Sequence, residues 1–126
     1  MPDPIWKSDP DEHDFPAAAD YLELIADAAT CTAIVDALRA APTVLKKAKD
    51  VLRAAGLPLL PTENPHVAAD FAKVRNGHAL SPVLLVRGDL RRGLSAQVAD
   101  GYHRICASWY LDENTQIPCR IAAPPA

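Results

Sequence analysis

The turn Asp100-Gly101-Tyr102-His103-Arg104 carries residue types that favour phosphate oxygens. Gly101 has no β-carbon, so a ligand can approach the backbone, and the helix predicted after it presents unpaired N–H groups at a positive dipole end. Arg104 offers a fork of donors, and His103 donates from either nitrogen, depending on its tautomer. This chemistry predicts an anion-binding turn with His103 as a proton shuttle. The alternative is a turn that only reverses the chain.

Two more residues belong to the predicted site. Asp100 either caps the following helix or, facing a bound magnesium ion, orients phosphate groups. Lys73 lies in the helix predicted over 64–77, where His66 and Arg75 are the other candidates and a solvated helix surface is the alternative for all three. The predicted ligand-binding residues are Asp100, Gly101, His103, Arg104 and Lys73, and the predicted catalytic residue is His103.

The histidines and cysteines show no metal-ligand spacing. The four histidines are His13, His66, His78 and His103. Because they are far apart in the sequence, a zinc site would require a long-range convergence that the spacing does not indicate. The three cysteines are Cys31, Cys106 and Cys119. They form no CxxC pair and are odd in number, so we expect buried, reduced thiols and no metal site.

Hydrophobic periodicity and helix start and stop signals predict the elements that position the turn. The predicted helices cover 16–29, 32–41, 42–56, 64–77 and 103–112. The predicted strands cover 82–86, 94–100 and 117–122, with an extended segment at 57–61 and a turn at 88–93. Residues 82–86 are a continuous apolar run, which is typical of a strand covered on both faces.

These elements predict one α/β domain with an N-terminal helical layer. With 126 residues and 49% hydrophobic composition, the chain can bury one core. Residues 1–15 form an irregular acidic arm, 16–56 the helical layer and 57–122 the α/β core. We expect the helical layer to pack on the core, since roughly 50 residues seldom fold alone.

The charge is distributed unevenly along the chain. The net charge is −3. The first 30 residues hold eight acids and one base, and this composition predicts a solvated arm or an irregular cover at the start of the chain. Lys46, Lys47, Lys49 and Arg53 form a basic cluster that could meet nucleic acid or an acidic partner, or simply be solvated. No segment reads as a signal peptide or a membrane span, so we expect a cytoplasmic protein.

The turn and the elements around it resemble the ParB/sulfiredoxin superfamily, in particular its ParB N-terminal nuclease-like domains. Its members carry a Gly-x-His/Arg-Arg signature between a strand and a helix, followed by a short terminal strand. The resemblance covers roughly residues 57–121 and is most specific at 100–104, with Ala107 three residues on. It implies a small mixed sheet with flanking helices, and phosphate contacts from Gly101, His103 and Arg104.

The sequence departs from the family's two best-known patterns. Sulfiredoxins have a catalytic Cys directly before the His-Arg pair, where this chain has Tyr102, which argues against sulfinic-acid reduction. ParB partition proteins carry Gly-Glu-Arg-Arg, and the acidic residue is missing here, which argues against CTP-gated clamping.

The resemblance and the turn chemistry together imply a nucleotide- or phosphate-binding domain, either a phosphotransferase or a hydrolase. ATP or CTP with Mg²⁺ are the expected cofactors. In this interpretation, Arg104→Ala weakens binding and leaves the fold intact. The alternative is a non-catalytic module of the ParB-like fold that binds a protein or DNA partner through the N-terminal helices.

Overall fold

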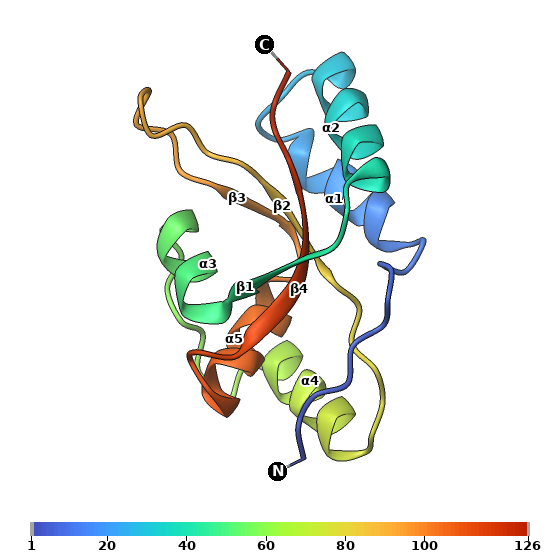
Figure 1. Ribbon diagram of the computed structural model, residues 1–126, viewed down its shortest axis with the longest axis vertical. Coiled ribbons are helices and arrows are strands. Elements are labelled where there is room, and N and C mark those ends of the chain that lie inside the picture. Colours follow the sequence, from blue (N-terminus) through green and yellow to red (C-terminus); the bar gives the residue numbers. More distant parts are fainter. Residues whose placement is uncertain (1, 126) are drawn as a thin grey trace.

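A four-stranded mixed sheet lies at the centre of the chain, with helices on both of its faces (Figure 1). The computed structural model describes residues 2–125. The helices are α1 (Asp14–Leu22), α2 (Ala28–Ala40), α3 (Ala48–Ala55), α4 (Pro65–Arg75) and α5 (Tyr102–Leu111). The strands are β1 (Val44–Lys47), β2 (Val83–Val86), β3 (Gln97–Asp100) and β4 (Gln116–Ala122). None of the helices in this part of the chain is both long and apolar enough to cross a bilayer.

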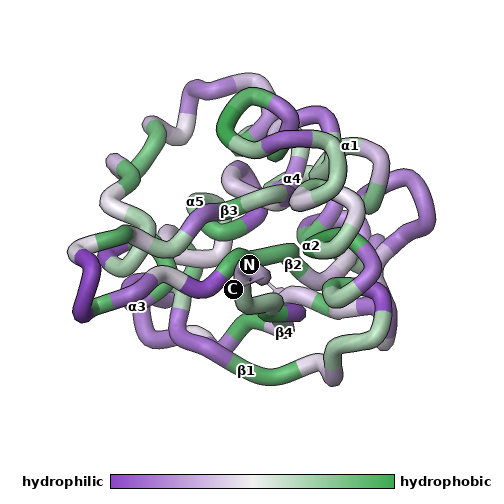
Figure 2. Tube along the Cα trace, turned by 90° about the horizontal axis from the view of Figure 1, so that it is seen from above, coloured by the Kyte–Doolittle hydropathy of each residue, from purple (hydrophilic) through white to green (hydrophobic). Residues whose placement is uncertain are grey.

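The sheet has the strand order β1-β4-β2-β3. β2 and β4 run parallel, with Val83 opposite Cys119, and the two outer pairs are antiparallel. The prediction of an α/β fold is confirmed at this level, and the three predicted strands correspond to β2, β3 and β4. β1, which was not predicted, forms an edge of the sheet (Figure 2).

The core is divided by the sheet, and β2 contributes to both halves. Val83 and Leu85 pack with residues of α3, α4 and α5, whereas Leu84 and Val86 pack with residues of α1 and α2. Successive side chains of a strand point to opposite faces, so a strand covered on both sides must be apolar throughout. The prediction that 82–86 forms a strand covered on both faces is therefore confirmed. The prediction that the N-terminal helices pack on the α/β core is also confirmed, since α1 and α2 contact the sheet.

The prediction of one helix over 42–56 is wrong for residues 42–47. Val44–Lys47 is strand β1, which pairs antiparallel with β4 through Val44 opposite Cys119 and Lys47 opposite Gln116. All four residues of β1 are exposed, so hydrophobic periodicity carried no information here. The pairing satisfies backbone groups of β4 that would otherwise form an open edge. α3 begins at Ala48 and ends before Gly56, whose φ is 64°, as the predicted stop signal requires.

The boundaries of the first two helices also differ from the prediction. α1 ends at Leu22, and a turn separates it from α2. The turn arises because Asp27 acts as an N-cap: its side chain accepts a hydrogen bond from Thr30 N–H at 2.8 Å. A predicted continuous helix over 16–29 is therefore interrupted by a capping residue within it.

The acidic N-terminal arm is bound to the body of the protein. Lys7 N–H donates to Leu80 O at 2.8 Å, and Leu80 N–H donates to Ile5 O at 2.8 Å. Farther along, Asp9 accepts a hydrogen bond from Arg120 of β4 at 2.6 Å. In Figure 1 the arm, in dark blue, runs beside the chain that leads into β2. Of the two predictions for this arm, a solvated arm and an irregular cover, the structure shows the irregular cover.

The three cysteines match their prediction. Cys31, Cys106 and Cys119 are free and buried. Burial raises the pKa of the Cys119 thiol to about 12, so this side chain behaves as a small apolar group.

Candidate functional site

The turn before α5 is shaped by Gly101. This residue is the N-cap of α5 and has a φ of 105°, a conformation that L side chains rarely adopt. A β-carbon at Gly101 would lie 2.5 Å from Cγ1 of Val83 and 3.0 Å from Nη2 of Arg104. Packing and backbone geometry therefore require glycine here, whether or not a ligand is bound.

An open cleft of about 780 Å³ lies beside this turn. Its walls come from the N-terminal arm, α1, α4, the segment that leads into β2, and the start of α5. All four histidines of the chain line it: His13, His66, His78 and His103. The fold thus supplies the long-range convergence that the spacing of the histidines did not reveal.

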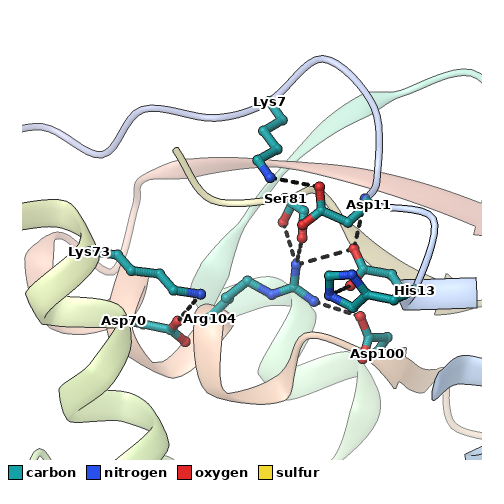
Figure 3. Close-up of polar contacts among 9 residues, drawn as sticks. Lys7, Asp11, His13, Asp70, Lys73, Ser81, Asp100 and Arg104 are labelled. Carbon is teal, nitrogen blue, oxygen red and sulfur yellow. Dashed lines mark hydrogen bonds and ion pairs between the residues drawn. The ribbon is translucent and has the colours of Figure 1, made fainter. Parts of the chain in front are cut away.

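Arg104 lies at the centre of the polar contacts in this cleft (Figure 3). Its Nη1 donates to Ser81 O at 2.7 Å and to the Ser81 hydroxyl, and its Nη2 donates to Asp100 Oδ2 at 2.7 Å. The Nη1 atom also lies 3.7 Å from Asp14 Oδ2. Only 12% of the Arg104 side chain is exposed. Arg104 therefore links α1, the chain before β2 and the end of β3, and any direct ligand contact would compete with these acceptors.

Each aspartate of the cleft has a cation beside it. Asp11 accepts a hydrogen bond from Lys7 at 2.7 Å, and Asp70 lies 4.0 Å from Lys73 Nζ. Burial raises the pKa of Asp70, and the nearby Lys73 opposes that shift. Asp100 is bound to Arg104 and does not cap α5, since no side chain within residues 2–125 caps that helix. The capping interpretation of Asp100 is therefore wrong.

One group of acidic residues has the spacing of a metal site. Single ligand atoms of Asp11, His13 and Asp14 all lie within 4.8 Å of one another. The Asp11 carboxylate is held by Lys7, and the Asp14 carboxylate lies beside Arg104 and accepts a hydrogen bond from Asp11 N–H at 3.0 Å. A divalent cation would have to displace these partners. The residues therefore do not fit a resident metal ion.

His103 lies against a second histidine. The ring centroids of His103 and His66 are 4.6 Å apart, and Tyr102 stacks on His103 with centroids 5.8 Å apart. Burial, together with the neighbouring His66, holds the pKa of His103 below its ordinary 6.5, and Asp70 opposes that shift. His103 is thus a neutral imidazole at neutral pH, able to accept a proton.

The structure brings the predicted site residues together. Asp100, Gly101, His103, Arg104 and Lys73 all line the same cleft. Of the two other candidates on α4, His66 lines the cleft and Arg75 does not. Ligand binding by these residues stays a prediction, because the structure shows only their placement.

Sequence reasoning missed several residues of the cleft. Asp70 left a signal: it lies between Val67 and Val74 on the buried face of α4, where an apolar residue is expected. Asp14 and Ser81 left none, because both are buried residues that contact Arg104, which is distant in the sequence.

Comparisons with protein-family models, curated proteins and solved structures find no match to this chain. The residues of the turn, and the order of β2, β3, α5 and β4, remain the grounds for the resemblance noted above.

Proposed function

We propose that this protein binds a phosphate-bearing small ligand, a nucleotide or another phosphate ester, in the cleft at the start of α5, and acts on it as a hydrolase or phosphotransferase. One observation carries the proposal: every histidine of the chain lines a single cleft, together with the uncapped N-terminus of α5. Four side chains drawn from separate segments meet where a helix end favours an anion.

The backbone of α5 supplies donors for the anion. The first intrahelical hydrogen bond of α5 runs from Ile105 N–H to Gly101 O at 3.1 Å. The N–H groups of Tyr102, His103 and Arg104 come before it, and no side chain within residues 2–125 caps them. Lys73, whose side chain is 54% exposed, lines the same cleft and adds an ammonium group.

Arg104 acts in this proposal as a positioning residue. Its bond to Asp100 Oδ2 holds the turn that presents Gly101, and its bonds to Ser81 fix the opposite wall. Its charge offsets Asp14 and Asp100, so these carboxylates repel an anion less than isolated ones would.

His103 is the group for proton transfer. As a neutral imidazole it accepts the proton of a water molecule or hydroxyl group whose oxygen forms a new bond to phosphorus. The ester or anhydride P–O bond breaks in the same displacement, and the leaving group departs with the electron pair as an oxyanion. Burial lowers the pKa of His103, and the exposed His66, 4.6 Å away between ring centroids, lowers it further. General-base catalysis of this kind contributes about 10²–10⁴-fold to a rate.

The binding step is tested by calorimetric titration of the whole chain with inorganic phosphate, ATP and CTP, each with and without magnesium. We expect saturable binding of at least one of them. Lys73→Gln should weaken binding about threefold to tenfold, since it removes one charge from the cleft. Lys49→Gln removes the same charge from α3, outside the cleft, and should leave binding unchanged. Absence of binding to all three probes, or an equal effect of both variants, would refute the proposal.

The catalytic step is tested with p-nitrophenyl phosphate and with the nucleotide that binds best. His103→Gln should reduce turnover about 100-fold or more and weaken binding only slightly, because it removes the proton acceptor and keeps a polar side chain. Equal losses of binding and turnover would show that His103 serves only as a clamp.

A further inference from the structure

A second surface of the protein lies away from the cleft and is strongly basic. It is formed by the loop between β2 and β3 together with β1 and α3, which lie on the same side of the molecule (Figure 1). Ala96 N–H of this loop donates to Ala54 O of α3 at 3.1 Å, so the two parts are joined. We call this the basic surface, and its cationic residues are Lys46, Lys49, Arg53, Arg87, Arg91 and Arg92.

The cations of the basic surface are mostly without partners. The only acids in residues 44–55 and 87–96 are Asp50 and Asp89. Asp50 lies 3.5 Å from Arg53, and Asp89 accepts a hydrogen bond from the backbone N–H of Arg91. Among residues 2–125, no ion pair includes any other cation of the basic surface. A protein with a net charge of −3 thus concentrates positive charge at one place.

An apolar groove of about 280 Å³ lies within the basic surface. Val51 of α3, Leu85 of β2 and Val98 of β3 line it, and the exposed Lys46 and Arg87, together with one exposed acid, Asp50, border the same space. The groove is therefore apolar on the inside with cations beside it.

Exposed leucines extend this apolar character beyond the groove. Leu90 at the tip of the loop is 98% exposed and Leu94 is 53% exposed. Exposed apolar side chains next to unpaired cations mark a surface that other molecules contact.

We infer that the basic surface binds an acidic segment of a partner protein that inserts an apolar side chain into the groove. Carboxylates of the segment pair with Arg87, Arg91 and Lys46, and its apolar residue fills the space between α3 and the sheet. A double-helical nucleic acid matches the charge, but its bases are paired inside the helix, so it presents phosphates rather than an apolar side chain to the groove and to Leu90. Charge complementarity and the apolar groove together thus favour a protein segment.

The inference is tested by selecting binders from a random-peptide phage library on the immobilised whole chain. We expect enrichment of peptides in which Asp or Glu flanks Leu, Ile, Val or Phe. Synthetic versions of the enriched peptides are then titrated against variants by fluorescence anisotropy, with a double-stranded DNA oligonucleotide as the competing probe.

Two pairs of variants locate the binding. Arg91→Glu should weaken peptide binding about fivefold or more, and Arg75→Glu, the same reversal on α4, should not. Ala54→Phe, which places a large side chain at the groove, should also weaken it about fivefold or more, whereas Ala68→Phe on the exposed face of α4 should not. Circular dichroism checks that each variant is folded, and Arg91 lies on an exposed loop where reversal preserves the fold.

Other results overturn the inference. Lack of enrichment above background, enriched peptides without acidic residues, or equal effects of the paired variants would each do so. Binding of the DNA oligonucleotide that is lost in Arg91→Glu and kept in Ala54→Phe would assign the basic surface to nucleic acid instead. None of these variants changes a residue that lines the cleft, so the outcome of the peptide experiment is independent of the proposed function.

Discussion

Gly101 is the residue with the least freedom to change. Its φ of 105° and the 2.5 Å approach of a β-carbon to Val83 combine backbone strain with a clash against a buried side chain. Gly101→Ala should lower the free energy of unfolding by about 3 kcal/mol, measured by urea denaturation. Gly77→Ala is the matched control: Gly77 has a φ of 72° but nothing within 4 Å of its β-carbon position, so about 1 kcal/mol is expected. Equal costs would show that the Val83 contact is unimportant.

Arg104 has a larger structural role than its sequence context suggested. Removing its side chain leaves the carboxylates of Asp14 and Asp100 without their cation in a region where only 6% and 20% of those side chains are exposed. We therefore expect Arg104→Ala to lower the free energy of unfolding by about 2–3 kcal/mol. From the sequence we expected Arg104→Ala to leave the fold intact. From the structure we now expect it to destabilise the fold.

The control for Arg104 is Arg75→Ala at the exposed end of α4. It should change the free energy of unfolding by less than about 0.5 kcal/mol. If Arg104→Ala proved equally mild, the contacts of Arg104 with Ser81 and Asp100 would contribute little to stability.

His103 makes stability depend on pH in a definite direction. Burial and His66 hold its pKa in the folded protein below the ordinary 6.5, so the unfolded chain binds this proton more readily. The resulting contribution to stability is present above pH 6.5 and is lost as the pH falls through the lower folded pKa. In NMR titration the His103 midpoint should therefore lie below 6.5. Wild type should lose more stability than His103→Gln over this range, and a midpoint above 6.5 would contradict the placement of His103.

The sequence indicated the turn at 100–104 but not the residues that hold Arg104 in place. Gly101 and His103 were recognisable because their chemistry is local to one turn. Asp14 and Ser81 were not, because an ordinary acid and an ordinary serine become part of the site only through Arg104. Asp70 could have been found as a polar interruption between Val67 and Val74.

Among the elements, α4 matters most for the cleft, and its N-cap is testable. The Asn64 side chain accepts hydrogen bonds from His66 N–H at 3.0 Å and Val67 N–H at 3.3 Å, so it fixes the turn that carries His66. Asn64→Ala should lower the free energy of unfolding by about 1 kcal/mol and also weaken phosphate binding. Asp27→Ala removes the cap of α2, away from the cleft, at a similar cost and with binding preserved. If Asn64→Ala and Asp27→Ala affected phosphate binding equally, α4 would have no specific part in the site.

Element prediction succeeded where local signals agree with packing. Asn64, Pro65 and the apolar face of α4 gave the right helix, and 82–86 gave the buried strand β2. It failed at 42–56, since β1 forms only because β4 offers an edge to pair with. Pairing partners as distant in the sequence as Val44 and Cys119 leave no periodic trace.

For the whole molecule, the cleft exists only because distant segments meet. The N-terminal arm is held by the backbone hydrogen bonds that join Leu80 to Ile5 and Lys7, and it contributes Lys7, Asp11 and His13 to one wall. α4 and α5 form the other side. Composition and periodicity indicated one α/β core but carried no information on this convergence, which depends on the tertiary fold.

The most direct test of the central claim is a titration of the isotope-labelled chain with inorganic phosphate, followed by amide and imidazole NMR signals. If phosphate binds at the start of α5, we expect saturable shifts of the amide signals of Tyr102, His103 and Arg104. The ring signals of His66 and His103 should shift as well, and the signals of α3 should stay unchanged. Shifts confined to the basic surface, or none at the start of α5, would contradict it.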